Sequence, residues 1–265
     1  MPKHIADLLD SWKIDKVSEF RAGRNLFEVD EQSPRLPKEQ AEKLHSGVAS
    51  ALFISKRAPR PDVLLPVNFL ATRVTKSTQQ DLGKFLKVLK YLNGSRDLVM
   101  RLVVDNDRTL YLYIDASYGV HDKGQSHTGS VLKYGKATIL FKSSKQKIVA
   151  KSSCEAELIG ASDETGQLLH AAEFLQHQGY EEFRDKPGVL YQDNQAAMKL
   201  EENGKGSSHR TKHISIRTFW IKDQVKLGKI KVMYMPTTEM LADMLTKPVQ
   251  GAAFHYFRKH IMNER

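Results

Sequence analysis

Cysteine is almost absent from this chain of 265 residues, whose one cysteine is Cys154. A lone cysteine cannot close a disulfide within the chain or build a cysteine-based zinc site, so the sequence favours a reducing compartment. Long apolar runs are also missing, because no stretch approaches the about 20 residues of a membrane-spanning helix. The start, Met1–His4, does not lead into a signal-peptide core. We therefore predict a soluble, intracellular and cytoplasmic protein that is not secreted and has no membrane partner.

Acidic residues are outnumbered by basic ones, with 31 Asp and Glu against 41 Lys and Arg and a formal net charge of +10. This excess suggests a polyanionic partner, because lysine and arginine contacts to phosphates release counterions. A merely solvated basic surface explains the charge equally well. Internal repeats and low-complexity segments are lacking too. The apolar content of 40% suffices for the core of one large domain or two ordinary ones.

The first part of the chain is predicted to form a small helical unit. Apolar residues recur at helical spacing in three segments, and a candidate strand precedes them. The expected helices are Lys38–Lys56, Pro61–Val74 and Ser77–Leu92, and the candidate strand is Asn25–Val29. The basic side chains of this unit form either a face that follows phosphates or an ordinary solvated surface.

After Gly94 the apolar period changes to two, which indicates strands. Thr109–Asp115 alternates apolar and polar residues and ends in an aspartate, and the short apolar strand Val189–Asp193 ends in another. Further strands are predicted at Gly129–Lys133, Thr138–Lys142, Lys147–Ala150 and Lys229–Met235. Helical segments are predicted at Asn194–Leu200, Ile214–Leu227, Glu239–Leu245 and Gly251–Arg265.

The stretch Ser152–Ser162 begins a long helix, whose apolar stripe ends before Gly179. Ser152 and Glu155 have the spacing of a capping box, in which the serine accepts the amide of Glu155 and the glutamate accepts the amide of Ser152. Glu157 lies on the flank of the apolar stripe, about 70° from its centre. A carboxylate there lies at the rim of the surface on which the helix packs, where a site can form.

Two strands that end in aspartate flank this helix. Their connectivity predicts parallel strands about 4.8 Å apart, with Asp115 and Asp193 at their carboxyl ends. Converging carboxylates repel one another unless a cation is present, and Mg²⁺ prefers a few carboxylates together with water and phosphate oxygens. A pair of such ions can stabilise both the attacking and the leaving oxygen of a phosphodiester displacement. The candidate ligands are Asp115, Glu157, Asp193 and either Glu239 or Asp243.

Four short motifs, in this order along the chain, resemble the ribonuclease H domain of copia-like LTR retrotransposon Pol polyproteins. They are Tyr113–Ser117, Ser152–Leu158, Leu190–Asn194 and Leu241–Asp243. Other segments are similar to the same domain or to the thumb- or connection-like end of the neighbouring reverse transcriptase. They are His209–Ile214 and Met235–Pro248 for the domain, and His45–Ala49, Arg60–Asp62 and Val88–Gly94 for the reverse transcriptase.

The resemblance implies an α/β fold with a ribonuclease H-like five-stranded mixed sheet flanked by helices. It divides the chain into residues 1–104 from the reverse transcriptase, residues 105–250 as the ribonuclease H-like domain, and residues 251–265 as a basic tail. It implies an endoribonuclease that hydrolyses the RNA strand of RNA–DNA hybrids with two Mg²⁺ or Mn²⁺ ions and leaves a 3′-hydroxyl. The implied partners are the hybrid and the remainder of a retrotransposon reverse transcriptase, and the implied location is a virus-like particle.

The same resemblance assigns residues of the site. Asp115, Glu157, Asp193 and Asp243 fall on the family's four metal-binding catalytic acids, and Glu155 keeps the capping role. Integrases share the fold, but the glutamate is the last of their catalytic acids in chain order. Glu157 is the second acid here, which argues for a ribonuclease H. A histidine that many members place before the last aspartate is missing, and His209 or His213 is a candidate substitute, with surface or packing roles as the alternative. Candidate nucleic-acid contacts are Ser117, Asn194, His209, Arg210, Lys212 and His213.

The polymerase core of a reverse transcriptase is missing, because the chain has no Tyr-X-Asp-Asp motif and no finger and palm regions. We expect no DNA synthesis, and we interpret Met1 as the start of a truncated gene copy or of a partial gene model. Two alternatives stand beside the hydrolase. In one, the chain is a retroelement remnant that binds nucleic acid without cutting it. In the other, residues 1–100 are a docking module for the absent polymerase.

Overall fold

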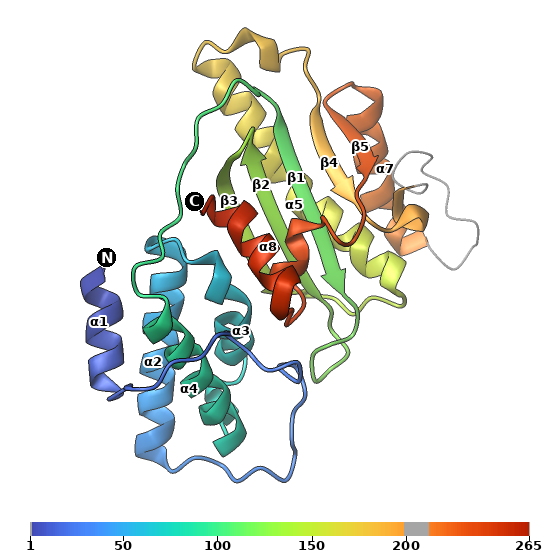
Figure 1. The fold of residues 1–265 in the computed structure, drawn as a ribbon. Coiled ribbons are helices and arrows are strands. Elements are labelled where there is room, and N and C mark those ends of the chain that lie inside the picture. Colours follow the sequence, from blue (N-terminus) through green and yellow to red (C-terminus); the bar gives the residue numbers. More distant parts are fainter. Residues whose placement is uncertain (1, 199–211, 265) are drawn as a thin grey trace. The chain divides into compact units, whose positions relative to one another are not determined.

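The computed structural model describes residues 2–198 and 212–264, and the chain divides into two units (Figure 1). The helical unit comprises Met1–Arg101 and Lys247–Arg265, and the sheet unit comprises Leu102–Thr246. Within the described residues, no helix is long and apolar enough to span a membrane.

Helices build the helical unit. They are α1 (Pro2–Ser11), α2 (Lys38–Arg57), α3 (Pro61–Ala71), the 3₁₀ turn η1 (Val74–Lys76), α4 (Gln79–Gly94) and α8 (Gly251–Met262). Of these, α2, α3, α4 and α8 lie where the sequence predicts helices. α3 begins with a proline, whose missing amide would have no partner in a first turn. α4 begins at a capping box, in which Thr78 and Asp81 exchange side-chain and backbone hydrogen bonds.

The predicted strand Asn25–Val29 is wrong. Its backbone turns back on itself, since the amide of Leu26 donates to the carbonyl of Gly23 over 3.2 Å and the amide of Glu28 donates to that of Asn25 over 3.1 Å. These local bonds satisfy groups that a strand would pair with a neighbouring strand.

A buried cluster of charges connects the start of α3 to α4. Arg60 and Asp62 are both fully buried, and the guanidinium binds both carboxylate oxygens, with Nε–Oδ1 at 2.9 Å and Nη2–Oδ2 at 2.7 Å. The hydroxyl of Tyr91 also donates to Oδ2 over 2.6 Å. Burial alone would raise the pKa of Asp62. The charge of Arg60 and the hydrogen bonds that Arg60 and Tyr91 donate hold this pKa below its usual range. Burial raises the pKa of Tyr91.

The helix α8 is part of the helical unit. Its apolar face is buried, and Phe254 lies under two guanidinium groups, those of Arg21 at 5.3 Å and Arg258 at 5.5 Å from the ring centroid. The backbone carbonyl of Met262 accepts the amide of Arg101 over 2.9 Å.

The sheet unit contains the five-stranded mixed sheet flanked by helices that the family resemblance implies, and this α/β fold class is confirmed. The strand order is β3-β2-β1-β4-β5, with β1 antiparallel to β2, β2 antiparallel to β3, and β4 parallel to both β1 and β5. The strands are β1 (Leu110–Ser117), β2 (His127–Tyr134), β3 (Ala137–Lys145), β4 (Gly188–Gln192) and β5 (Ile230–Tyr234).

The predicted strand Lys147–Ala150 is wrong, because the chain leaves the sheet at Gln146. The amide of the Gln146 side chain donates to the hydroxyl of Thr128 and to the carbonyl of Ala156, both over 2.9 Å, and so ties the sheet to the helix that follows. Ile148 and Val149 are exposed, and their apolar side chains are what made this loop resemble a strand.

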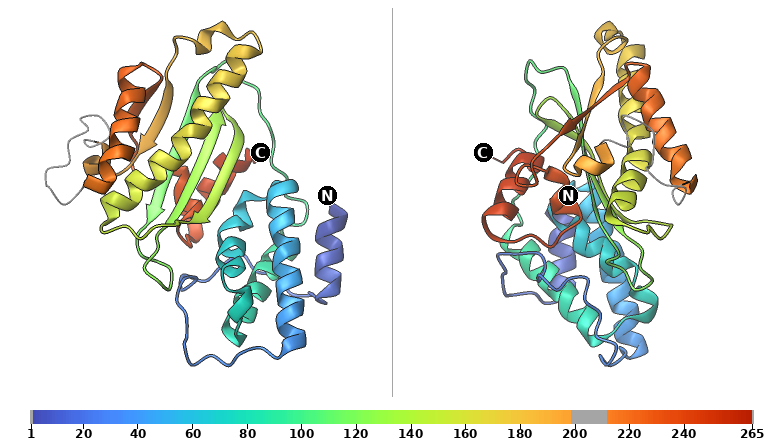
Figure 2. Two further views of the ribbon diagram at one scale, coloured as in Figure 1. Left: turned by 180° about the vertical axis from the view of Figure 1, so that it is seen from behind. Right: turned by 90° about the vertical axis from the view of Figure 1, so that its right-hand side faces the viewer.

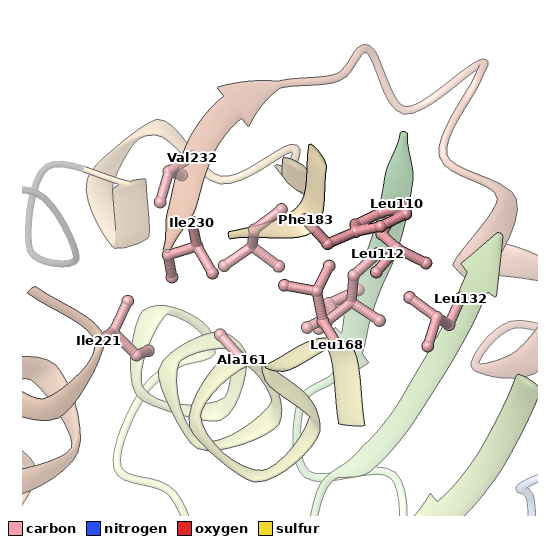
Figure 3. Packing of buried hydrophobic residues seen from close by; sticks show 11 residues of the cluster. Leu110, Leu112, Leu132, Ala161, Leu168, Phe183, Ile221, Ile230 and Val232 are labelled. Atoms are coloured by element: carbon pink, nitrogen blue, oxygen red, sulfur yellow. The ribbon is translucent and has the colours of Figure 1, made fainter. Parts of the chain in front are cut away.

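The helices α5 (Ser153–His177) and α7 (Lys212–Lys226) cover one face of the sheet (Figure 2). The remaining helical elements of this unit are η2 (Glu181–Phe183) and η4 (Leu241–Leu245). Leu110 and Leu112 of β1 pack with Ala161 and Leu168 of α5 and with Ile221 of α7 in a continuous apolar core (Figure 3). This core fixes the position of α5 over β1.

Candidate active site

Three carboxylates meet at one edge of the sheet. Asp115 lies in β1, Asp193 follows β4 directly, and Glu157 lies in the second turn of α5. One oxygen from each lies within 4.8 Å of the others. Asp115 and Glu157 are buried, with 2% and 5% of their surfaces exposed, and Asp193 is partly buried.

The register of the two parallel strands places the aspartates side by side. Tyr113 of β1 is paired with Tyr191 of β4, and their rings lie 4.9 Å apart. Asp115 and Asp193 each come two residues later, so both side chains lie on the same face and at the same level of the sheet. The predicted parallel strand–helix–strand arrangement is confirmed.

The start of α5 separates the roles of its two glutamates. Ser152 accepts the amide of Glu155 over 3.2 Å, as predicted. The carboxylate of Glu155 accepts the amide of Lys151 over 2.7 Å, one residue before the donor that the capping box predicts. Glu157, which faces the sheet, accepts the amide of Ala116 over 3.1 Å and is thereby held beside the end of β1.

Hydroxyl groups also orient the aspartates. Thr246, which follows η4, donates its hydroxyl to Oδ2 of Asp115. Thr237 donates to Oδ2 of Asp193 over 3.1 Å, and the side-chain carbonyl of Gln192 accepts the amide of Asp193 over 3.1 Å. The acids are therefore held in place by donors from several segments of the sheet unit.

Asp243 is buried in η4, which packs against β1 and β2. It does not belong to the group of carboxylates within 4.8 Å of one another that the described residues form. Glu239, the other candidate for a fourth ligand, is exposed. Metal binding by Asp243 therefore stays a prediction.

The candidate nucleic-acid contacts are placed unevenly. Ser117 donates its hydroxyl to the carbonyl of Thr246 over 2.9 Å. Asn194 caps the helical residues 195–198, because its side-chain oxygen accepts the amides of Ala196 and Ala197 over 3.0 and 3.1 Å. His209 and Arg210 lie outside the described residues, and so do the side chains of Lys212 and His213 at the start of α7. Their contacts with nucleic acid stay predictions.

Sequence reasoning missed four residues behind Asp115. They are Gly129, Ser143, His127 and Thr246, and they come from β2, β3 and the end of η4. The motif from Met235 to Pro248 includes Thr246, but neither periodicity nor composition indicates that its hydroxyl meets an aspartate 131 positions earlier.

The donor set of this site fits a hard divalent cation. Its three ligand groups are all carboxylates, which suit Mg²⁺ or Mn²⁺ better than a metal that prefers histidine or thiolate. Three ionised carboxylates at this separation repel one another, and a cation between them relieves that repulsion. The arrangement can therefore bind a divalent metal at the carboxyl edge of a parallel strand pair.

Comparison with known proteins finds Pol polyproteins of transposons among the relatives, although no protein-family model matches the chain. The chain is 34% identical over 203 residues to a retrovirus-related Pol polyprotein from transposon RE1 of Arabidopsis thaliana, which covers 76% of this chain and 14% of that protein. It is 31% identical over 211 residues to the Pol polyprotein from transposon TNT 1-94 of Nicotiana tabacum, or 79% of this chain and 16% of the relative. It is 24% identical over 234 residues to the Ty1-JR1 Gag-Pol polyprotein of Saccharomyces cerevisiae. This match covers 86% of this chain and 13% of the relative. The chain thus spans a small part of the length of these curated relatives.

The comparison with solved structures also found matches. One match is LC11-RNase H1 in complex with an RNA/DNA hybrid, with 17% identity and a TM-score of 0.36. The match covers 52% of this chain and 93% of the LC11-RNase H1 chain. The protease–reverse transcriptase of prototype foamy virus covers 84% of this chain and 27% of its own, with 14% identity and a TM-score of 0.32.

Proposed function

Because the chain is homologous to a segment of the retrovirus-related Pol polyproteins of copia-type transposons, we propose that it is a metal-dependent endoribonuclease. Its substrate is the RNA strand of an RNA–DNA hybrid, and its products carry a 3′-hydroxyl. We assign this activity to the sheet unit, and we propose that the helical residues before it derive from the end of a reverse transcriptase.

The observation that carries this proposal is the group of three carboxylates at the edge of the sheet. Asp115, Glu157 and Asp193 come from two adjacent parallel strands and the helix between them, and their oxygens lie within 4.8 Å of one another. Three carboxylates this close together repel one another and destabilise the fold unless a cation lies between them. A site of this composition therefore supports metal-assisted chemistry.

In this proposal Asp115, Glu157, Asp193 and Asp243 hold two Mg²⁺ ions, which Mn²⁺ can replace. When bound, the ions supply an activated water and stabilise the charge on the attacking and leaving oxygens of the phosphodiester. The hydrogen bonds from Thr246, Thr237 and the Ala116 amide orient the carboxylates. The net charge of +10 favours a nucleic-acid substrate through its phosphates.

The test is a cleavage assay on the purified chain with hybrid, duplex DNA and duplex RNA side by side, each with Mg²⁺, Mn²⁺ or a chelator. We expect cleavage of the hybrid alone, in its RNA strand and only with metal. Hybrid binding that weakens with salt, without metal-dependent cleavage, would refute the nuclease and favour a protein that binds nucleic acid without cutting it.

A further inference from the structure

Gly129 allows η4 to approach the sheet directly behind the acidic edge. It is the residue of β2 that is paired with Asp115 across the antiparallel strands. A Cβ atom at this position would lie 2.7 Å from Cγ2 of Thr246 and 2.9 Å from both the carbonyl oxygen of Ala242 and Cβ of Leu245. Any side chain here would therefore push the end of η4 away from Asp115.

Thr246 uses this approach to reach the acidic edge. It is fully buried, and its hydroxyl donates to Oδ2 of Asp115. Its backbone carbonyl accepts the hydroxyl of Ser117, the last residue of β1, over 2.9 Å. The side chain and the backbone of Thr246 are thus both hydrogen-bonded to the strand that carries Asp115.

A chain of buried side chains holds the preceding residue, Leu245. Ser143 of β3 donates its hydroxyl to the Leu245 carbonyl over 2.7 Å, so the Ser143 oxygen must accept from Nε2 of His127 at 2.7 Å. Burial lowers the pKa of His127 and keeps its ring neutral, so Nδ1 carries no proton and accepts from Nε2 of His121 at 2.9 Å. The direction of every hydrogen bond in this relay is therefore fixed.

We propose that Thr246 is a positioning residue that fixes the rotation of the Asp115 carboxylate for metal binding. Gly129 and the His121–His127–Ser143 relay hold Thr246 in place. Because one lone pair of Oδ2 is engaged by the hydroxyl, the carboxylate presents its other lone pairs toward a cation in one orientation. This inference rests on the metal site of the proposed function, but it does not depend on the substrate.

The test compares two substitutions at one position. Thr246→Val keeps the shape of the side chain and removes the hydroxyl, whereas Thr246→Ser keeps the hydroxyl and removes a methyl group. The measured quantity is the dissociation constant of Mn²⁺ for the full chain in the absence of nucleic acid, from titration calorimetry. Asp115→Asn, which removes a ligand, identifies the binding that belongs to this site.

We expect Thr246→Val to weaken Mn²⁺ binding about 10-fold or more, as loss of groups that orient metal ligands does elsewhere. Thr246→Ser keeps the hydroxyl, so its affinity for Mn²⁺ should stay within about threefold of that of the original chain. Gly129→Ala should weaken binding in the same direction, because it displaces the same hydroxyl. If Thr246→Val unfolds more readily but binds Mn²⁺ as tightly as the original chain, its role is purely structural and the proposal fails.

The result also separates this inference from the proposed function. If the original chain binds Mn²⁺ at Asp115 in a Thr246-dependent manner but does not cut hybrids, the positioning role stands and the nuclease assignment fails. If the chain cuts hybrids and Thr246→Val changes neither Mn²⁺ affinity nor the Mg²⁺ concentration for half-maximal cleavage, the nuclease stands and the positioning role fails.

Discussion

Glu155 and Glu157 are both buried near the start of α5, but they bind different parts of the chain. Glu155 accepts the amide of Lys151 at the start of its own helix, and Glu157 accepts the amide of Ala116 in β1. Of the two, Glu157 is the one whose carboxylate lies with those of Asp115 and Asp193. Within three residues, one glutamate therefore binds the start of its own helix and the other belongs to the group of carboxylates at the sheet edge.

The first prediction compares these glutamates. Glu157→Gln removes a ligand charge, and we expect hybrid cleavage to fall by about 100-fold or more, since metal ions contribute several kcal/mol and about 1.4 kcal/mol is tenfold in rate. Glu155→Gln should keep cleavage and lower the free energy of unfolding by about 1 kcal/mol or less, as other helix caps do. Cleavage rates and urea unfolding of both variants check this. Unchanged cleavage by Glu157→Gln would refute the assignment of the site.

The second prediction concerns metal and stability together. Mn²⁺ at about 100 times its dissociation constant should raise the free energy of unfolding by about 2.7 kcal/mol, because it binds the folded chain. Asp193→Asn and Asp115→Asn should lose this gain and most hybrid cleavage. Without metal, Asp193→Asn should unfold no more readily than the original chain, since it relieves repulsion among the acids. Thermal unfolding with Mn²⁺ and with a chelator measures both effects, and a full Mn²⁺ gain in Asp193→Asn would contradict the site.

The third prediction concerns the buried charge cluster of the helical unit. Asp62→Asn leaves the guanidinium of Arg60 buried without a counter-charge, so we expect a loss of about 3–5 kcal/mol in the free energy of unfolding. The matched control is Glu182→Gln, which breaks the solvent-exposed pair of Arg108 and Glu182 and should change the free energy of unfolding far less than Asp62→Asn does. Urea titrations of both variants give the comparison. Equal losses in the two would show that burial does not decide the strength of the Asp62 pair.

Local patterns in the sequence predicted most of the fold and the centre of the site. Helical spacing predicted α2, α4 and α5 to within a few residues, and the aspartates at two strand ends predicted the convergence of Asp115 and Asp193. Periodicity alone could not distinguish Glu155 from Glu157. The resemblance to a known family made that distinction, and the contacts of the two side chains agree with it.

The missed features depend on contacts between distant segments. Gly129 looks like an ordinary strand glycine until η4 is seen to lie against it, and the roles of Thr246 and Ser143 follow from that approach. The loop around Ile148 imitates a strand because exposed apolar residues have the same local pattern as buried ones. Tertiary packing decided these positions, and a linear pattern carries little of that information.

The last prediction concerns pH and the relay behind Thr246. Burial lowers the pKa of His127 from 6.5 to about 3, with a smaller contribution from His121. Burial and nearby Lys145 lower the pKa of His121 to about 4, against the opposing effect of Asp122. Below about pH 6.5 the unfolded chain therefore binds protons that the folded chain excludes, so stability is complete above that pH and is lost as the pH falls toward 4.

The slope should reach at most about 1.4 kcal/mol per pH unit for each histidine. Urea unfolding between about pH 8 and about pH 5.5 measures it, above most of the range in which carboxylates titrate. His127→Gln keeps a donor and an acceptor but cannot take up a proton, so it should reduce the slope while losing some stability at every pH. If His127→Gln loses stability on acidification as steeply as the original chain, His127 does not titrate on unfolding, and the acid sensitivity comes from other groups.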